Sequence, residues 1–218
     1  MPETLTIDVW SDVVCPFCYL GHRQLHDALA RFEHRASVDV RYHAFELDPR
    51  APLADGTALN EMLASKYSIT LAQAAAMNQR VADLAQELGM SWRLERAQPT
   101  NTFDAHRVIA HAARQGRQVE MLERLFRAYF CDGELVSDPA TLTRLATAAG
   151  VTGVADVLES DLGAQEVRDD ESLASRIGIT GVPALIFDRR IHVSGAQGTD
   201  AMYDALNTAW SQHVETSP

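Results

Sequence analysis

The chain has 218 residues, 46% of them hydrophobic, which is enough to bury the core of one sizeable domain or of a domain with a large insert. Its formal net charge is -11 and its basic residues do not cluster, which argues against nucleic acid as a partner. No stretch approaches the roughly 18 to 20 apolar residues of a membrane span, and the first residues carry no positively charged signal region. We therefore expect a protein that works in the cytoplasm and not at a membrane.

The first predicted elements are a strand and a helix that meet at the motif CPFC, residues 15–18. The apolar run Leu5 to Trp10 predicts the strand, and Pro16 is suited to the first position of a helix that begins at Cys15. Unpaired backbone N–H groups and the positive end of the helix dipole then favour a thiolate at Cys15. Cys18 lies one turn further along the same face. An exposed thiolate with a second thiol in reach predicts disulfide exchange.

The same cysteines also begin a run, Cys15, Cys18, His22 and His26, whose residue types could ligate zinc. On one helix, however, Cys18 and His26 are separated by roughly 12 Å, at about 1.5 Å of rise per residue. Ligand bonds of about 2 Å to a single tetrahedral ion do not span that distance. We therefore predict no metal site, and expect the two histidines to lie on the polar face of the helix or in helix packing.

The cysteine content fits a reducing compartment. Thiols in the cytoplasm are kept reduced, so a C-x-x-C motif there is more often catalytic than structural. The third cysteine, Cys131, follows an apolar helical pattern and precedes Asp132-Gly133. We expect it to be a free, partly buried thiol at a helix end rather than a third redox partner.

The next segments predict a second strand and a helical block. Apolar and polar residues alternate from Ser37 to Phe45, which is typical of a strand with one buried face, so that strand, helix and strand open a thioredoxin-like βαβ unit. From Ala58 to about Ser160 the apolar period becomes helical, with a capping box at Thr70-x-x-Gln73. The expected helical segments within the block are 59–67, 70–88, 103–113, 119–130, 139–149 and 154–158.

The end of the chain returns to strands. A helix over about 161–177 precedes two short strands, 184–188 and 191–194, with Arg189-Arg190 as the turn between them, and a final helix over 200–210. Pro183 stands directly before the first of these strands, where a trans proline would remove a ladder donor. A cis Val182–Pro183 bond at a tight entry to the strand is the alternative that accounts for this position. The predicted organisation is a thioredoxin-like domain in two parts, 1–56 and 161–218, around an inserted helical subdomain, 57–160.

Four features together resemble the FrnE-type branch of the DsbA-like thioredoxin superfamily: the segment DVVCPFCYLG (12–21), the helical insert, GVPA (181–184) and SGAQ (194–197). The resemblance covers nearly the whole chain. It implies an α/β thioredoxin-like fold, βαβ…ββα with a mixed sheet, interrupted by a large all-helical insert. It also implies Cys15 as nucleophile, Cys18 as resolving cysteine and Pro183 as a cis-proline facing them. The backbone of Val182 would pair with an extended substrate segment.

Three further residues are expected to support the site. DsbA has a histidine between its cysteines at the position of Phe17, so the resemblance implies a less oxidising disulfide here, with Phe17 packing against substrate. Asp12 lies near the thiols and could relay a proton to or from Cys18, or act only as a carboxylate near the helix start. His106 follows the Gln98-Pro99 break in a segment that overhangs the cleft in related proteins, although a surface or helix-packing role also explains it.

Two other functions remain open. Kappa-class glutathione transferases and 2-hydroxychromene-2-carboxylate isomerases share the split fold and a similar motif, but usually carry serine at the positions of Cys15 and Cys18. The two cysteines favour a thiol-disulfide oxidoreductase or isomerase acting on a disulfide-containing protein or small molecule. We expect no permanently bound cofactor, with glutathione as an available co-substrate. The third function is a non-catalytic redox sensor or partner-binding protein that docks through its insert.

Overall fold

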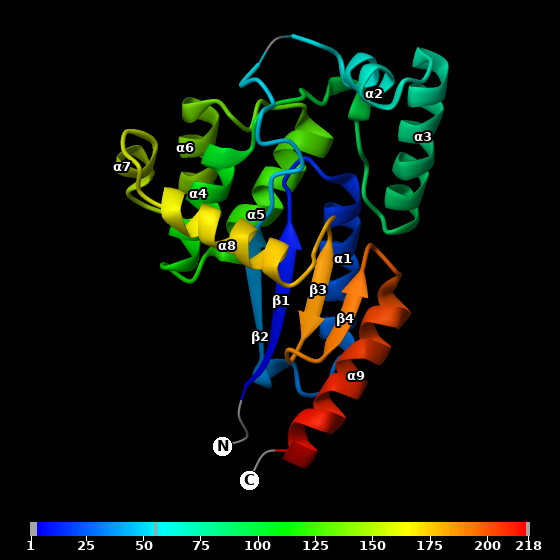
Figure 1. Cartoon of the computed structure of the whole chain (residues 1–218), viewed down its shortest axis with the longest axis vertical. Helices are drawn as coiled ribbons and strands as arrows, with labels where there is room; N and C mark the ends of the chain where they lie inside the picture. The colour runs from blue at the N-terminus through cyan, green and yellow to red at the C-terminus, as the bar shows by residue number, and fades with distance from the viewer. Residues whose placement is uncertain (1–3, 55, 217–218) are drawn as a thin grey trace.

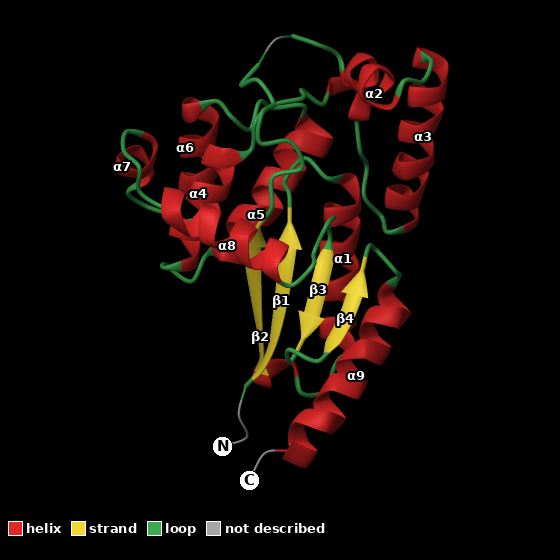
Figure 2. Cartoon of the chain, in the orientation of Figure 1, coloured by secondary structure: helices red, strands yellow, loops and turns green. Residues whose placement is uncertain are grey.

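The computed structural model describes residues 4–54 and 56–216, which form a four-stranded sheet flanked by helices, with a helical block at one end (Figures 1 and 2). The strands are β1 (Leu5–Ser11), β2 (Val38–Ala44), β3 (Ala184–Phe187) and β4 (Ile191–Ser194). Their spatial order is β2-β1-β3-β4, with β2 parallel to β1 and the other two pairs antiparallel. This mixed sheet has the predicted thioredoxin-like topology.

One face of the sheet is covered by α1 (Pro16–Arg31) and α9 (Thr199–Thr216). Leu5, Ile7 and Val9 of β1 are buried in the same hydrophobic cluster as Leu20 and Leu25 of α1. This alternation follows from the strand period of two, which sends every second side chain of β1 to the same face.

The final helix extends six residues beyond the predicted end at Trp210. The ring of Trp210 stacks on that of His34, with 4.5 Å between ring centroids. The buried His213 pairs with Asp188, at 3.3 Å between Nδ1 and Oδ2. These contacts hold the last turns of α9 against the rest of the domain, and the apolar pattern alone did not indicate them.

The opposite face of the sheet is covered by α8 (Ala164–Arg176), which begins three residues later than predicted because Gly163 adopts a left-handed backbone with φ of 82°. His43 of β2 connects this helix to the sheet. Its Nδ1 lies 2.7 Å from Asp170 of α8 and its Nε2 2.9 Å from Asp8 of β1. Burial lowers the pKa of His43, but hydrogen bonds to Asp170 and Asp8 outweigh it and raise the pKa to about 9.

The helical block consists of α2 (Leu59–Tyr67), α3 (Leu71–Glu87), α4 (Phe103–Ala113), α5 (Gln118–Arg127), α6 (Pro139–Ala148) and α7 (Val154–Leu158). Short 3-10 turns occur at Arg35–Ser37 and Leu94–Arg96, and a π-helical turn, Ala128–Asp132, follows α5. The predicted capping box is present, since Gln73 N–H donates to Thr70 Oγ1 at 3.2 Å and Thr70 N–H donates to Gln73 Oε1 at 2.9 Å. The predicted division of the chain at residues 57 and 160 stays a prediction.

Two side chains of the block connect it to neighbouring segments. The side-chain amide of Gln118 pairs with the backbone of Tyr42 as a neighbouring strand would. Its Oε1 accepts from Tyr42 N–H at 3.0 Å, and its Nε2 donates to Tyr42 C=O at 2.8 Å. The guanidinium of Arg107, which is buried, donates to the carbonyl of Leu162 at 3.0 Å and also to those of Val157 and Ser160. Arg107 therefore fixes the connection from α7 to α8.

The elevated pKa of His43 predicts that stability declines as the solution becomes alkaline. A folded pKa near 9, above the unfolded value of about 6.5, gives a stabilisation that is complete below about pH 6.5 and lost as pH rises through about 9. We expect the free energy of unfolding to fall by about 2 to 3 kcal/mol over that window, measured by urea denaturation. His43→Asn should lack this dependence. His192→Asn, at an exposed position of β4, should keep it, and an unchanged slope in His43→Asn would contradict the prediction.

Candidate active site

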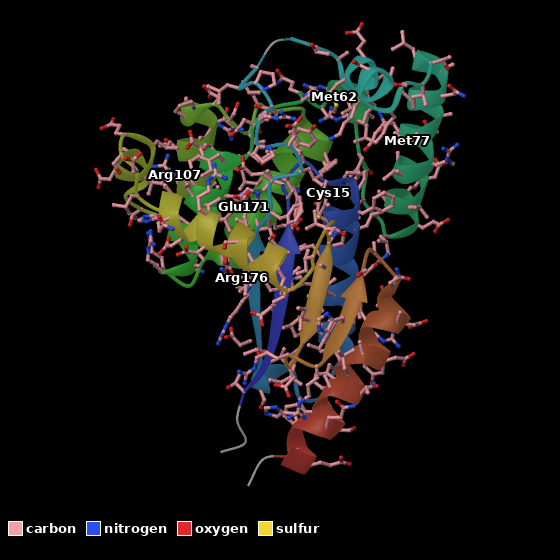
Figure 3. All side chains as sticks on the ribbon, viewed as in Figure 1. Cys15, Met62, Met77, Arg107, Glu171 and Arg176 are labelled. Carbon is pink, nitrogen blue, oxygen red and sulfur yellow. The ribbon has the colours of Figure 1, made fainter. Side chains whose placement is uncertain are left out.

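Cys15 lies where the start of α1 meets the helical block, with Met62 of α2 and Met77 of α3 above it (Figure 3). It is the N-cap residue of α1, with Pro16 in the first helical position as predicted. The sulfur accepts no capping hydrogen bond from the described backbone, and the positive end of the helix dipole lies at this position. Cys15 and Cys18 are both free thiols.

The expectation of an exposed Cys15 thiolate is wrong. Only 4% of Cys15 and 1% of Cys18 are exposed. The Val182–Pro183 loop lies against the thiol, with Val182 O 3.6 Å from Cys15 Sγ, so that the thiol donates to this carbonyl. The position of Cys15 at the start of a helix would leave it exposed, and the Val182–Pro183 loop buries it.

The Val182–Pro183 bond is cis, as predicted, and Pro183 packs against α1 at Gly21. A Cβ atom added at Gly21 would lie 3.1 Å from Pro183 Cγ, which is tighter than ordinary van der Waals contact. Glycine therefore allows the loop to approach the active-site helix. The sequence pattern did not indicate this role for Gly21. A glycine inside a helix costs about 1 kcal/mol relative to alanine, and that cost is a signal of close packing.

Cys18, at 1% exposed, is the more deeply buried of the two thiols. Burial raises the pKa of the Cys18 thiol well above its ordinary value, and its hydrogen bond and charge interaction with Cys15 act in the same direction. The backbone N–H of Asp12 points to Cys18 Sγ at 3.5 Å and opposes this shift. Cys18 is therefore a protonated thiol held behind the helix-capping Cys15, an arrangement suited to a resolving cysteine.

Asp12 and His106 are brought together by the fold. Asp12 Oδ1 lies 3.3 Å from His106 Nε2, and Asp12 Oδ2 accepts from Leu47 N–H at 2.8 Å. His106 is buried, so it is not a surface residue, and it joins α4 of the helical block to the loop before Cys15. The contact between Asp12 and Cys18 runs through the Asp12 backbone, while the carboxylate is directed to His106 and Leu47.

A second group of contacts, centred on Glu123 of α5, was not predicted. Tyr19 OH donates to Glu123 Oε1 at 2.9 Å, and His22 Nε2 lies 3.1 Å from Glu123 Oε2. Burial raises the pKa of Glu123, but the contacts with His22 and Tyr19 and the nearby His26 together outweigh it, and the pKa is lowered. The ring of Tyr19 stacks on Phe126 at 4.8 Å between centroids. The residue that follows Cys18 is thus anchored to the helical block, and no sequence spacing links positions 19 and 123.

His22 and His26, whose residue types could ligate zinc, both form hydrogen bonds with the hydroxyl of Tyr42. His22 Nδ1 lies 2.7 Å and His26 Nε2 3.3 Å from Tyr42 OH. Burial lowers the pKa of His26 to about 4, so it is neutral at pH 7. Within residues 4–54 and 56–216, no group of three or more histidine, cysteine or acidic side chains is placed to hold a metal ion.

The two remaining predicted positions are Phe17 and Cys131. Phe17 is 43% exposed, so the residue between the two cysteines presents an apolar ring to solvent. Cys131 lies in the π-helical turn and is half-buried, as predicted, and burial raises the pKa of its thiol. Its carbonyl accepts from Arg93 Nε at 2.6 Å.

Residues 6–207 match the family model described as a DSBA-like thioredoxin domain. The chain therefore belongs to the DsbA-like thioredoxin family, a class of thiol-disulfide oxidoreductases. It is 36% identical to a solved structure described as a probable DsbA oxidoreductase, SCO1869 from Streptomyces coelicolor, with a TM-score of 0.91 over 98% of this chain and 92% of that one. It is 26% identical to the uncharacterized protein YwbO of Bacillus subtilis over 94% of this chain and 96% of the relative.

More distant structures share the fold alone. One is described as the cytosolic disulfide reductase DsbM from Pseudomonas aeruginosa with GSH, 20% identical, with a TM-score of 0.68 over 94% of this chain and 99% of that one. Another is a 2-hydroxychromene-2-carboxylate isomerase, 15% identical, with a TM-score of 0.69 over 98% of this chain and all of that one. Among the described residues, no helix is long and apolar enough to cross a membrane.

The contact between Gly21 and Pro183 predicts that Gly21→Ala slows disulfide exchange without unfolding the protein. The added methyl displaces the loop by a few tenths of an ångström and moves Val182 O relative to Cys15 Sγ, while the gain in helix propensity of about 1 kcal/mol offsets the strain. We expect at least a several-fold lower rate of insulin reduction, about 1 kcal/mol or more in activation free energy. Gly181→Ala, in the same loop with open space around it, is the matched control, and equal rates for both variants would argue against the prediction.

Proposed function

We propose that the protein is a cytoplasmic, FrnE-type thiol-disulfide oxidoreductase or isomerase in which Cys15 is the nucleophile and Cys18 the resolving cysteine. The observation that carries the proposal is the asymmetry of the two thiols. Cys15 caps the N-terminus of α1 beside the carbonyl of Val182, whereas Cys18 is more deeply buried with a raised pKa. One sulfur is prepared to attack, and the other is held as a thiol one turn behind it.

The reaction follows from these positions. The Cys15 thiolate attacks one sulfur of a substrate disulfide, forming a mixed disulfide and releasing the other substrate sulfur as a thiolate. The Cys18 sulfur, on losing its proton, then attacks Cys15 Sγ, forming the Cys15–Cys18 disulfide and releasing the second substrate thiolate. Two electrons pass from the protein thiols to the substrate disulfide, and the reverse sequence oxidises a substrate dithiol.

Substrate binding is assigned to the surface around Cys15. In the reduced protein the Val182 carbonyl accepts a hydrogen bond from the Cys15 thiol. Once Cys15 is in a disulfide it has no S–H to donate, and the carbonyl becomes available to a substrate N–H. Backbone pairing with Val182 suits an extended peptide, and the exposed ring of Phe17 suits apolar substrate surface. Asp12 and His106 support the site by fixing the loop that precedes Cys15.

Two other candidate functions differ from this one in the disulfide substrates that the protein would reduce. A glutathione-dependent isomerase or transferase shares this fold, but the two free cysteines favour disulfide exchange, with glutathione as a small-molecule co-substrate. A redox sensor or partner-binding protein would turn over no disulfide substrate at an appreciable rate. Steady-state reduction of insulin and of oxidised glutathione separates the three functions.

The assignment of roles predicts different trapping by the two cysteine variants. Cys18→Ser should accumulate a mixed disulfide with oxidised glutathione, because Cys15 attacks and no thiol resolves the product. Cys15→Ser should accumulate none, and Cys131→Ser should behave as wild type. Intact-protein mass spectrometry measures the adduct, and equal trapping by the first two variants would sink the assignment.

The apolar Phe17 predicts a disulfide that oxidises less strongly than that of DsbA, because its ring supplies no polar stabilisation of the Cys15 thiolate. We expect an equilibrium midpoint against glutathione more negative than the value of about -120 mV for DsbA. Phe17→His should shift the midpoint to less negative values, and Tyr67→His, at an exposed aromatic residue of α2, should not. A wild-type midpoint at or above that of DsbA would contradict this prediction.

A further inference from the structure

Asp12, in the loop between β1 and α1, contacts both cysteines through its backbone. Its N–H points to Cys18 Sγ, with 3.5 Å between nitrogen and sulfur, and its C=O accepts from Cys15 N–H at 3.1 Å. Asp12 is only 1% exposed, and its contact with Cys18 is buried. The orientation of this backbone segment therefore determines whether the N–H reaches the sulfur of Cys18.

The side chain of Asp12 holds the segment in that orientation. Its Oδ2 accepts from Leu47 N–H at 2.8 Å, in the loop after β2, and its Oδ1 lies 3.3 Å from Nε2 of His106 in α4. Only 4% of His106 is exposed, so the pairing is shielded from solvent. Rotation of the Asp12 backbone would break buried contacts with two other segments, and polar groups left unpaired in the interior are costly. The N–H is thus fixed before any reaction begins.

The resolving step places negative charge on Cys18, and the surroundings of this sulfur oppose it. Burial raises the pKa of the Cys18 thiol well above its ordinary value, and the Asp12 N–H acts in the opposite direction. The other titratable groups that face Cys18 are Cys15 of α1 and Tyr42 of β2. Cys15 is in the mixed disulfide at that stage and has no S–H to donate, and the Tyr42 hydroxyl is engaged by His22 at 2.7 Å.

We propose that the Asp12 N–H is the donor that stabilises the Cys18 thiolate in the resolving step, and that His106 is the positioning residue that holds this N–H on the sulfur through the Asp12 carboxylate. The inference rests on the proposed function. A fixed backbone dipole aimed at the atom where charge develops needs no rearrangement during the reaction. Cys18 loses its proton and bonds to Cys15 Sγ, while the bond from Cys15 to the substrate sulfur breaks. The substrate sulfur leaves with that electron pair and takes up a proton, so the substrate is released as a thiol.

The carboxylate of Asp12 has a different part from that of a general base. Both its oxygens are engaged by other groups, so it holds the backbone in place and does not accept the Cys18 proton. His106 also faces Glu46, whose carboxylate pairs with Arg168 of α8 at 2.6 Å. The acidic groups that face His106 are therefore Asp12, which it contacts, and Glu46, whose charge Arg168 compensates.

Rapid-quench experiments on the reduced protein with oxidised glutathione test the proposal, because they separate formation of the Cys15 mixed disulfide from its resolution by Cys18. Asp12→Ala and His106→Leu loosen the N–H, so the pH at which the resolution rate levels off should rise by about one unit. Such a shift leaves about tenfold less thiolate at pH 7, but a thiolate of higher pKa is the stronger nucleophile, so resolution should slow about threefold or more. Formation of the mixed disulfide should keep its wild-type pH profile.

Conservative variants separate this role from a merely structural one. Asp12→Asn and His106→Gln, whose amides can form the same contacts, should recover most of the resolution rate and its pH profile. His111→Leu is the matched control, because His111 lies in the same helix with its ring directed to Thr152 C=O, and it should resolve the mixed disulfide as wild type does. If Asp12→Ala fails to fold, the comparison of His106→Leu with His106→Gln decides the question.

Wild-type resolution and pH profile in both Asp12→Ala and His106→Leu would overturn the proposal. So would an Asp12→Asn variant as slow as Asp12→Ala, which would identify the carboxylate as the acceptor of the Cys18 proton. Equal slowing of formation and resolution would also overturn it, because a general distortion of the motif affects both steps. Absence of any mixed disulfide at Cys15 in the wild type would instead refute the proposed function, and this inference with it.

Discussion

The site depends on the packing of one loop against the first turns of one helix. The Val182–Pro183 loop rests on Gly21 of α1, and from there the Val182 carbonyl reaches the sulfur of Cys15. These segments are more than 160 positions apart in the chain, and β1 and β3, which lie side by side in the sheet, bring them together. The sheet thus fixes the distance between Cys15 and the Val182–Pro183 loop.

The helical block does more than border the sheet. His106 of the block contacts Asp12, in the loop before Cys15, and Glu123 accepts a hydrogen bond from Tyr19, the residue after Cys18. The motif is therefore held on both sides. Buried polar contacts of this kind are costly to leave incomplete, and they therefore fix a single position for the block relative to the thiols. The residues on either side of the thiol pair are in this way held by side chains about 90 to 105 positions away in the chain.

The sequence predicted what depends on local pattern. Strand period, helix period, the proline after Cys15 and the capping box at Thr70 each act within a few residues, and the structure contains all of them. The cis Val182–Pro183 bond was also predicted, from a proline placed before an apolar strand together with the resemblance to the DsbA-like family. Burial of Cys15 and the role of Glu123 were not, because both arise from contacts between distant segments that leave no spacing in the sequence.

The amide of Gln118, which pairs with the backbone of Tyr42, has a consequence for self-association. β2 is an edge strand, and an unoccupied edge offers its N–H and C=O groups to a strand from another molecule. Gln118 fills both positions at Tyr42, so an incoming strand would have to displace a formed pair of hydrogen bonds to zip along β2. The Gln118 side chain thereby opposes edge-to-edge aggregation along β2. The edge strand β4 is then the side of the sheet where another chain could add.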